Sequence, residues 1–445
     1  MNTIFAQASA PGKAGVSVFR ISGPTALKSL AQLVCQTNPK FEPRKLYFRK
    51  IYNPKNNQQI DDALVVFFKG ASSFTGEDSV EIYTHGSIAV IKMMHQVLAS
   101  LEDVRIAEPG EFAKRAFLNG KIDLTSAEGL ADLIDAETDL QLKQAVGQLG
   151  GGLEKIYEGW RLELLKIISL VEAYIDFPDE DIPEETINAV RQLVDRITNE
   201  IKLHLDDNHR GERLRNGIKL AIVGRPNVGK SSLLNYLMKR EIAIVSNIAG
   251  TTRDVIEGHL DIGGYPIILQ DTAGIHDHTE DVIEQEGINR AWNAAKNSDI
   301  KIIIHDASRI NDISGYFKDI IDANTIIVLN KIDLVSGTLP HTIYGHKPIN
   351  VSIKNEQGLN EIIAEIVSIA DKIARPSQSP QITRARHRSQ LQKALEYMSN
   401  FSLNDDLVLA AEDLRMTMRA ISNITGKITV DEILGEIFSN FCIGK

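Results

Sequence analysis

Residues 224–231 read Gly-Arg-Pro-Asn-Val-Gly-Lys-Ser, after an apolar run that favours a β-strand and before a run that favours a helix. In this context the pattern predicts a P-loop, because the two glycines let backbone N–H groups curl around phosphate oxygens at the amino end of a helix. Lys230 would then reach the β- and γ-phosphates of a nucleotide, and Ser231 would offer its hydroxyl to Mg²⁺. The alternative is an accidental glycine-rich turn, and the flanking strand and helix patterns argue against it.

Three further segments follow in the order that a guanine-nucleotide hydrolase requires. Asp271-Thr-Ala-Gly274 ends a strand-like run, so its carboxylate can hold Mg²⁺ through water and its last N–H can sense a γ-phosphate. Asn330-Lys-Ile-Asp333 ends another, and Asp333 can accept both the ring N–H and the amino group of guanine. Adenine offers no such pair of donors. Ser352-Ile-Lys354 stands where a loop backs the guanine oxygen, although its middle residue is more often alanine.

Two sequence features concern the hydrolytic step: a candidate switch I segment, and the lack of a glutamine at the position that usually orients the attacking water. Gly250-Thr-Thr-Arg-Asp254 is the candidate switch I, and Thr252 is placed to complete the Mg²⁺ shell when a γ-phosphate is present. Ile275 stands where Ras-like enzymes keep the glutamine that orients the attacking water. We therefore expect another group to orient the water, and Glu284 is the candidate. An ordinary exposed acid is the alternative reading of Glu284.

Two other patterns flank this block. The first 120 residues or so alternate β-rich and helical runs, whereas helical spacing dominates from about Thr125 and again after Arg375–Pro380. The predicted strands are Ala63–Phe68, Val80–Thr84, Leu220–Val223, Pro266–Gln270, Ile302–His305 and Thr325–Leu329. The predicted helices include Ala89–Leu101, Gln390–Tyr397 and Leu407–Ile421. Two apolar helical faces are also predicted, one formed by Leu164, Ile168, Val171 and Ile175 and the other by Val190, Val194, Ile197, Ile201 and Leu205. We predict a multidomain α/β plus all-α fold: an α/β domain (1–120), a helical domain in two parts (121–216 and 376–445), and a P-loop (Ras-like) GTPase domain (217–375) inserted between them.

Composition sets limits on partners and compartment. With 59 acidic and 49 basic residues among 445, the formal charge is −10, which is the wrong sign for gripping nucleic acid over the whole surface. Cys35 and Cys442 are too few for a disulfide scaffold and fit a reducing cytoplasm. We expect no targeting segment and no membrane span. His276 and His278 lack a third ligand at suitable spacing, so a loop is favoured over a metal site there.

Motifs outside the predicted GTPase range, residues 217–375, which we call the nucleotide block, carry a specific resemblance. They are Pro11-Gly-Lys-Ala-Gly-Val16, Arg20-Ile-Ser-Gly23, Ser73-Phe-Thr-Gly-Glu-Asp78, Glu108-Pro-Gly-Glu-Phe112, Arg115-Ala-Phe-Leu-Asn-Gly-Lys121 and the terminal Phe441-Cys-Ile-Gly-Lys445. Together with the P-loop, switch I and the central insertion, these make the whole chain similar to the tRNA-modifying GTPase family called MnmE or TrmE.

The resemblance implies an amino-terminal domain that forms a homodimer and binds a reduced folate carrying a formyl group, 5-formyltetrahydrofolate. The matching positions are Arg20, Glu81, Lys121 and Lys445. Carboxylates and cations suit the pteridine edge and glutamate tail of a folate. From the residues alone, they read as an ordinary surface Arg, Glu and Lys.

The resemblance also implies K⁺-stimulated hydrolysis, in which a bound K⁺ replaces the arginine finger while two GTPase modules meet. Asn227, Ser246, Thr251 and the carbonyl of Ile248 match the K⁺ positions, Ser231 and Thr252 match the Mg²⁺ positions, and Glu284 matches the residue that orients water. The residues expected at GTP or GDP and its ions are Gly224, Asn227, Val228, Gly229, Lys230, Ser231, Ser232, Ser246, Asn247, Ile248, Ala249, Gly250, Thr251, Thr252, Asp271, Thr272, Ala273, Gly274, Asn330, Lys331, Asp333, Ser352, Ile353 and Lys354.

The implied reaction joins this chain to an FAD-containing partner, MnmG or GidA, in a heterotetramer that adds a 5-carboxymethylaminomethyl-type group to the wobble uridine of certain tRNAs. Cys442 is a candidate nucleophile toward the pyrimidine ring, with a buried small hydrophobe as the alternative. Arg384, Arg386, His387 and Arg388 form a candidate patch for tRNA phosphate or the start of a solvated helix.

Two other functions share some of these motifs. A ribosome-assembly GTPase would have the same nucleotide motifs, but such proteins usually append a recognisable RNA-binding domain. A membrane-linked switch would need a lipidation signal. The terminal Cys-Ile-Gly-Lys has glycine where a prenylation box wants an apolar residue, and lysine at its end is unfavourable.

Overall fold

The structure is a computed structural model that describes residues 2–36, 40–176, 184–240, 243–244, 258–270, 292–312, 315–377, 379–403, 406–428, 434, 437–438, 441–442 and 444. The chain divides into two compact units. The first comprises Met1–Ala131, Glu154–Arg161 and Ile421–Lys445, and the second comprises Asp132–Leu153 and Leu162–Ala420.

A six-stranded sheet organises the first unit. Its order is β3-β4-β5-β2-β1-β6, and the pairs are antiparallel except β1 with β6. The strands are β1 (Thr3–Gln7), β2 (Ala14–Ser22), β3 (Leu46–Asn53), β4 (Gln58–Phe68), β5 (Ser79–Gly86) and β6 (Val104–Ile106). The accompanying helices are α1 (Ala26–Leu33), α2 (Ile88–Ala99), α3 (Glu111–Leu118), α4 (Leu124–Asp135) and the short η1 (Gly70–Ser72).

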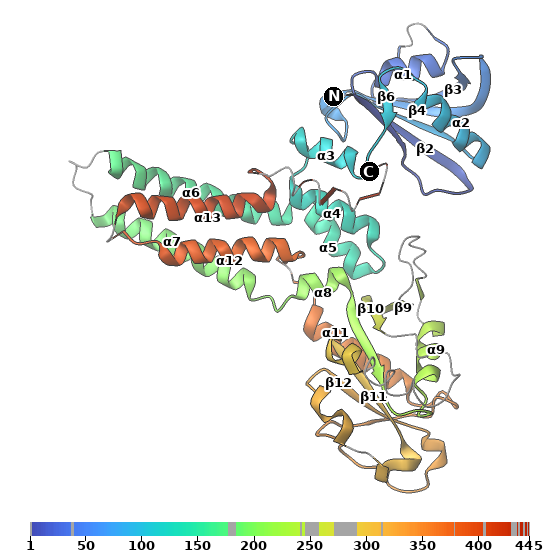
Figure 1. Cartoon of the computed structure of the whole chain (residues 1–445), viewed down its shortest axis with the longest axis vertical. Coiled ribbons are helices and arrows are strands. Elements are labelled where there is room, and N and C mark those ends of the chain that lie inside the picture. Colours follow the sequence, from blue (N-terminus) through green and yellow to red (C-terminus); the bar gives the residue numbers. More distant parts are fainter. Residues whose placement is uncertain are drawn as a thin grey trace. The chain divides into compact units, whose positions relative to one another are not determined.

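The two faces of this sheet differ. Alternate residues such as Phe19, Val65 and Ile82 are fully buried on the face that carries α1 and α2 (Figure 1). The opposite face carries Arg20, Glu81 and Tyr83, whose positions follow from strand register. The predicted strands lie within β4 and β5, and the predicted helix 89–101 is α2, which ends two residues earlier, at Ala99.

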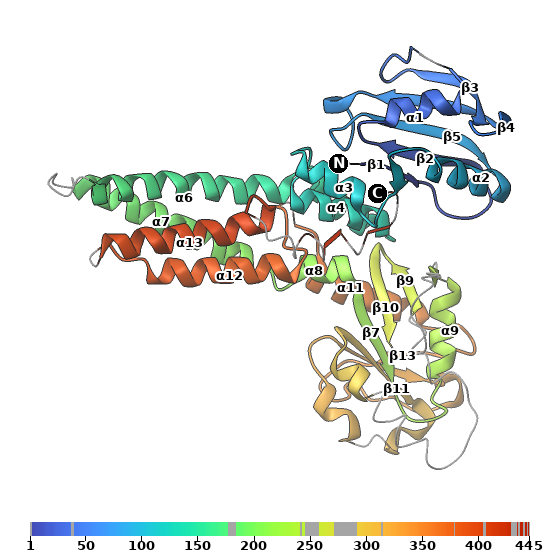
Figure 2. The same cartoon turned by 45° about the horizontal axis from the view of Figure 1, so that its top comes forward.

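Helical elements occupy most of the rest of the chain outside the P-loop domain. They are α5 (Asp139–Leu149), α6 (Gly152–Asp176), α7 (Glu184–Leu205), α8 (Arg210–Asn216), α12 (Ala385–Asn400) and α13 (Leu407–Thr425). In both views the parts of α6, α7, α12 and α13 that belong to the second unit run side by side (Figure 1, Figure 2). The predicted apolar faces are buried, as Leu164, Val171, Val194 and Ile201 illustrate, so the helical bundle is confirmed.

The nucleotide block is a seven-stranded sheet of order β13-β12-β11-β7-β10-β9-β8. Its elements are β7 (Ile218–Val223), α9 (Lys230–Arg240), β8 (Ala243–Ile244), β9 (Gly258–Ile262), β10 (Tyr265–Gln270), β11 (Ile300–Asp306), η3 (Ala307–Asp312), η4 (Gly315–Ile320), β12 (Thr325–Asn330), η5 (Ile332–Leu334), β13 (Ile349–Asn350) and α11 (Leu359–Ala374). The strands from β13 to β10 are parallel.

Burial on both faces explains the sequences of these central strands. Every residue of β12 is buried, and side chains of β11 enter two separate apolar clusters. The four predicted strands lie within β7, β10, β11 and β12, so the expected parallel sheet is confirmed. The carboxyl ends of β7, β11 and β12 meet at one edge, which is where an open parallel sheet places ligands.

Candidate functional site

The turn after β7 has the close packing that its glycines allow. Asn227 and Gly229 both have positive φ, at 60° and 109°. A Cβ atom added to Gly229 would lie 2.3 Å from the Asn330 side-chain nitrogen, and one added to Gly224 would lie 2.4 Å from the Ile304 carbonyl oxygen. Glycine is therefore required here by space as well as by conformation.

The helix that follows directs its first residues at this turn. α9 begins at Lys230, whose Nζ donates to the carbonyl oxygens of Gly224 at 3.0 Å and Arg225 at 2.9 Å. The ammonium group thus lies across the loop. Ser231 occupies the same first turn and is partly exposed. A helix amino terminus, a lysine and a hydroxyl in one place can bind polyphosphate and a hard cation.

Side chains at and after the end of β12 join the P-loop to the segments Asn330–Asp333 and Ser352–Lys354. The Asn330 amide donates to the Val228 carbonyl oxygen at 2.8 Å and its oxygen accepts from the Ile353 N–H at 3.1 Å. The fully buried Ser352 donates its hydroxyl to Asp333 Oδ1 at 2.6 Å. This hydrogen bond fixes one oxygen of the Asp333 carboxylate. Ile353, the residue that departs from the common alanine, contributes through its backbone N–H and leaves this arrangement intact.

Lys331 is held between the P-loop and a carboxylate that the sequence did not single out. Its Nζ donates to the Asn227 carbonyl oxygen and to Asp306 Oδ2, each at 2.7 Å. Burial alone raises the pKa of Asp306, but hydrogen bonds from Lys331 and Ser308 outweigh it and hold that pKa below its usual value. Asp306 is the last residue of β11, one position beyond the predicted strand.

Several predicted site residues lie outside the described residues. They are Ser246, Asn247, Ile248, Ala249, Gly250, Thr251, Thr252, Asp271, Thr272, Ala273, Gly274 and Glu284 at the nucleotide, Lys445 at the folate, and also His276 and His278. Of the predicted nucleotide residues, the structure therefore brings together those of the P-loop and of the two base-side segments.

A second group of polar residues lies on the open face of the amino-terminal sheet. Arg20 pairs with Glu81 at 2.8 Å, and Tyr83 donates its hydroxyl to the other Glu81 oxygen at 2.6 Å. The Arg20 guanidinium also lies over the rings of Phe74 and Phe112, at 5.9 and 5.7 Å from their centroids. Burial, followed by the hydrogen bond to Glu81, raises the pKa of Tyr83 to about 12.

Lys121 reaches the same loop as Arg20. Its Nζ donates to the Ala71 carbonyl oxygen at 2.7 Å, three residues before Phe74. Three predicted folate residues, Arg20, Glu81 and Lys121, thus contact one another or one loop. Sequence reasoning missed Tyr83, although its spacing of two from Glu81 places both side chains on one face of a strand.

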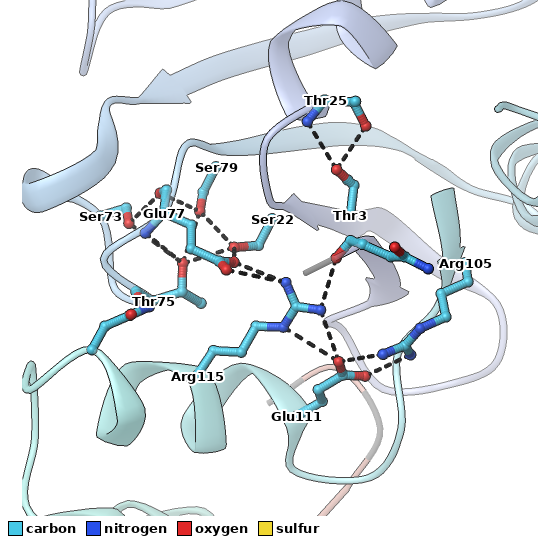
Figure 3. A network of polar contacts seen from close by, with 12 residues as sticks. Thr3, Ser22, Thr25, Ser73, Thr75, Glu77, Ser79, Arg105, Glu111 and Arg115 are labelled. Carbon is cyan, nitrogen blue, oxygen red and sulfur yellow. Dashed lines mark hydrogen bonds and ion pairs between the residues drawn. The ribbon is translucent and has the colours of Figure 1, made fainter. Parts of the chain in front are cut away.

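A buried ionic network anchors that loop. The Arg115 side chain, 4% exposed, pairs with Glu77 at 3.0 Å and Glu111 at 2.9 Å. Arg105 pairs with Glu111 from the outer side at 2.6 Å, and Ser22 donates to Glu77 at 3.0 Å (Figure 3). Burial raises the pKa of Glu111, but hydrogen bonds from Arg105, the Glu108 backbone and Arg115 together lower it. The network joins β2, the loop before β5 and α3.

The described part of the carboxyl terminus also belongs to the first unit. The Cys442 carbonyl oxygen accepts from the Gly110 N–H at 3.4 Å, and a Cβ atom on Gly444 would lie 2.4 Å from the Gln7 carbonyl oxygen. The Cys442 side chain is exposed. The alternative interpretation of Cys442 as a buried hydrophobe is therefore wrong.

The basic cluster at the start of α12 is largely neutralised by acids. Arg384 pairs with Asp132 at 2.7 Å, and Arg388 pairs with Asp207 at 2.6 Å and with Glu212 at 3.4 Å. His387, within the same cluster, is fully buried. These ion pairs argue against a phosphate patch. The cluster does begin a helix, but the burial of His387 and Arg388 shows that this helix start is not solvated.

Two family models together match nearly the whole chain. The family model described as "GTP-binding protein TrmE N-terminus" matches residues 3–121, and that described as "MnmE helical domain" matches residues 124–442. The chain is 58% identical over 447 residues to the tRNA modification GTPase MnmE of Rickettsia canadensis (strain McKiel), with complete coverage of both chains. It belongs to the MnmE family. Against the MnmE of Rickettsia prowazekii (strain Madrid E), identity is 57% over 451 residues, again with complete coverage.

Solved structures with partial likeness include a probable GTP-binding protein EngB, at 19% identity and a TM-score of 0.25, which covers 35% of this MnmE-family chain and 99% of its own. The cytosolic domain of the T. maritima FeoB iron transporter has 19% identity and a TM-score of 0.27, covering 47% and 98%. None of the helices that the structure describes has the length and hydropathy of a membrane span.

Proposed function

We propose that this chain binds and hydrolyses GTP and acts in modification of the wobble uridine of tRNA. One observation supports both the specificity for guanine and the role in tRNA modification. Asp333 is held by Ser352 beside a P-loop, in a chain whose relatives over its full length are named tRNA modification GTPases. A hydrogen-bonded carboxylate at that position accepts two donors from guanine and none from adenine.

The cell-level experiment tests this function directly. We expect tRNA from cells lacking the protein to carry unmodified wobble uridine at positions that wild-type cells modify, measured by mass spectrometry of purified tRNA. Re-expression of the wild-type chain should restore the modification, and re-expression of the Asp333→Asn variant should not. Intact modification in the deleted cells would instead favour a ribosome-assembly GTPase.

Two cations belong to the proposed hydrolytic site. Ser231 in the first turn of α9, together with Thr252, would hold Mg²⁺, and the exposed Asn227 side chain, together with Ser246, Thr251 and the Ile248 carbonyl, would hold K⁺. A monovalent cation there would neutralise charge developing between the β- and γ-phosphates. Lys230 and Glu284 complete the proposed machinery, the first by binding phosphate and the second by orienting water.

We expect GTP turnover to rise at least about tenfold when K⁺ replaces Na⁺ at equal ionic strength. The residue after Gly274 is not the usual glutamine, and in this proposal K⁺ takes the role of an arginine finger in neutralising the charge on the phosphates. Steady-state phosphate release measures the change. Replacing Glu284 by Ala should lower turnover about 10²-fold or more while GTP affinity stays near that of the wild type. Equal rates in the two salts would remove K⁺ from the mechanism.

The open face of the amino-terminal sheet is the proposed site for 5-formyltetrahydrofolate. Arg20 and Glu81 form a mutually oriented cation and carboxylate, the Phe74 ring is partly exposed beside them, and Lys121 provides a second cation. This set fits a flat heterocycle with an anionic tail. Lys445, beyond the described residues, would add a third cation.

Replacing Glu81 by Gln should weaken binding of 5-formyltetrahydrofolate at least about tenfold, because a charged hydrogen bond to the pteridine is lost. Isothermal titration of the full chain measures it. Asp61, on the neighbouring strand and bonded to His85, provides a matched control, since Asp61→Asn also removes one carboxylate. Equal loss in both variants would show only a general effect of charge.

Partner and assembly proposals follow from the same face. Leu46, Phe48, Leu64 and Val16 expose 53, 62, 40 and 55% of their surface, and they lie on the sheet face that carries Arg20. An exposed apolar face of this kind suits a homodimer. Sedimentation velocity should give a dimer that Phe48→Asp converts to a monomer.

An FAD-containing MnmG-type chain is the proposed second partner, and co-purification with MnmG tests this. Cys442 would act on uridine in that complex.

A further inference from the structure

One segment of the first unit has a charge opposite to that of the chain. Residues 40–55 contain six basic residues and one acidic residue, within a chain of formal charge −10. Aromatic residues are interspersed with the basic ones. We call this segment the β3 strip; its basic members are Lys40, Arg44, Lys45, Arg49, Lys50 and Lys55, and its aromatic members are Phe41, Tyr47, Phe48 and Tyr52.

The strip lies along an edge of the sheet. β3 pairs with β4 on one side, and in the strand order of the described sheet it has no neighbour on the other. The Lys45 and Lys50 side chains are 56 and 53% exposed, and Lys55 is exposed in the turn between β3 and β4. Eight strand residues at about 3.3 Å each extend this edge over roughly 26 Å, which is enough to follow several phosphates of a nucleic acid.

The strip keeps most of its charge. Lys45 pairs with Glu42 at 3.1 Å and Lys50 with Asp62 at 3.4 Å, but all four side chains are at least 40% exposed, so water and salt weaken these pairs. Arg44 donates to a carbonyl oxygen, that of Ser72. These cations therefore remain able to bind an added anion.

Arg49 is the most ordered cation of the strip. Its guanidinium lies over the rings of Tyr47 and Phe41, at 5.1 and 5.7 Å from their centroids, and its Nη1 donates to the Phe48 carbonyl oxygen. No carboxylate of the described residues pairs with it, and its Nε has no hydrogen-bond partner there. Stacking thus fixes a guanidinium whose charge the described residues do not balance, which is the arrangement that phosphate recognition uses.

Protection of an edge strand is the simpler explanation for lysines at this position. That explanation accounts for one or two charges in a short, otherwise polar edge. It does not account for six cations in sixteen residues, one of which, Arg49, is stacked on two aromatic rings. A row of exposed cations along one strand edge fits a polyanion that offers a line of phosphates.

We propose that the β3 strip is a contact surface for the phosphate backbone of RNA. This proposal rests on the proposed function, since it names where the tRNA substrate meets a chain of net negative charge. Lys45, Lys55, Arg44 and Arg49 contact phosphates through charge, and the contact is largely independent of sequence.

Salt-dependent binding of the full chain to a fluorescein-labelled tRNA transcript tests the surface. Lys45→Ala with Lys55→Ala should weaken binding at least about tenfold at 0.1 M salt and reduce the slope of log K against log salt by roughly 1.5, because two phosphate contacts are lost. Lys28→Ala with Lys92→Ala is the matched control. It also removes two exposed lysines of the same domain, one of which, like Lys45, belongs to an exposed ion pair. GTP turnover should stay unchanged in both.

The outcomes separate this surface from the function it rests on. A loss in the strip variant and not in the control, together with an Arg49→Ala variant that also lowers the slope, supports the strip. Any of three results overturns the strip proposal. The wild type and the strip variant bind equally, or the strip and control variants lose binding equally, or the wild type shows no salt-dependent RNA binding. If wobble uridine stays modified in cells lacking the protein, the proposed function is overturned instead. The salt-dependent binding measurement still shows whether the β3 strip binds RNA.

Discussion

Replacing Asp333 by Asn should lower GTP affinity by about 10²- to 10³-fold and raise affinity for xanthosine triphosphate. The Asn oxygen can still accept from the guanine ring N–H, but the charge of the acceptor is lost and the Asn NH₂ group faces the guanine amino group, donor against donor. Xanthine carries an oxygen at that position and accepts from the amide instead. Titration with fluorescent analogues of the two nucleotides measures the reversal.

Ser352→Ala is the matched control for this reversal. Its hydroxyl donates to Asp333 Oδ1 at 2.6 Å, so its loss frees the carboxylate without changing its charge. We expect GTP affinity to fall by about tenfold, with no gain for xanthosine triphosphate. Loss of GTP binding by the Asn variant without any gain in xanthine affinity would show that Asp333 acts through the fold of the loop and does not read the base.

The nucleotide block could be predicted closely because its motifs are local. The P-loop, Asn330 and Asp333 follow strands whose apolar runs are legible, and the structure brings them together at one sheet edge. Asp306 could not be found this way. It reaches Lys331 only because β11 and β12 pair with Asp306 opposite Asn330, a register that a sequence does not state.

The amino-terminal face was less accessible to sequence reasoning. The resemblance alone points to Arg20 and Glu81, and their ion pair depends on the register of β2 against β5. The motif containing Arg115 was legible as a resemblance, but nothing in it indicated a buried residue. Its carboxylate partners stand 38 and four residues away, at Glu77 and Glu111, and only folding brings them together.

Replacing Arg115 by Ala should destabilise the amino-terminal fold by about 3–5 kcal/mol, because Glu77 loses its cation and the largely buried Glu111 keeps only the half-exposed Arg105. The exposed fractions of the side chains are 4% for Arg115, 16% for Glu77 and 10% for Glu111. Hydrogen exchange in the full chain measures this locally, and we expect amides of β1, β5 and α3 to exchange at least about 10²-fold faster.

Arg105→Ala separates the buried charge from the general effect of losing an arginine. Arg105 pairs with the same Glu111 at 2.6 Å, but its side chain is 43% exposed, so its loss should cost about 1 kcal/mol or less. Combining Arg115→Met with Glu77→Gln and Glu111→Gln should restore part of the protection, since the uncompensated charges are gone. If Arg115→Ala exchanged no faster than Arg105→Ala, the network would not be what anchors the loop that carries Phe74, and the geometry of the proposed folate site would have to depend on the strands alone.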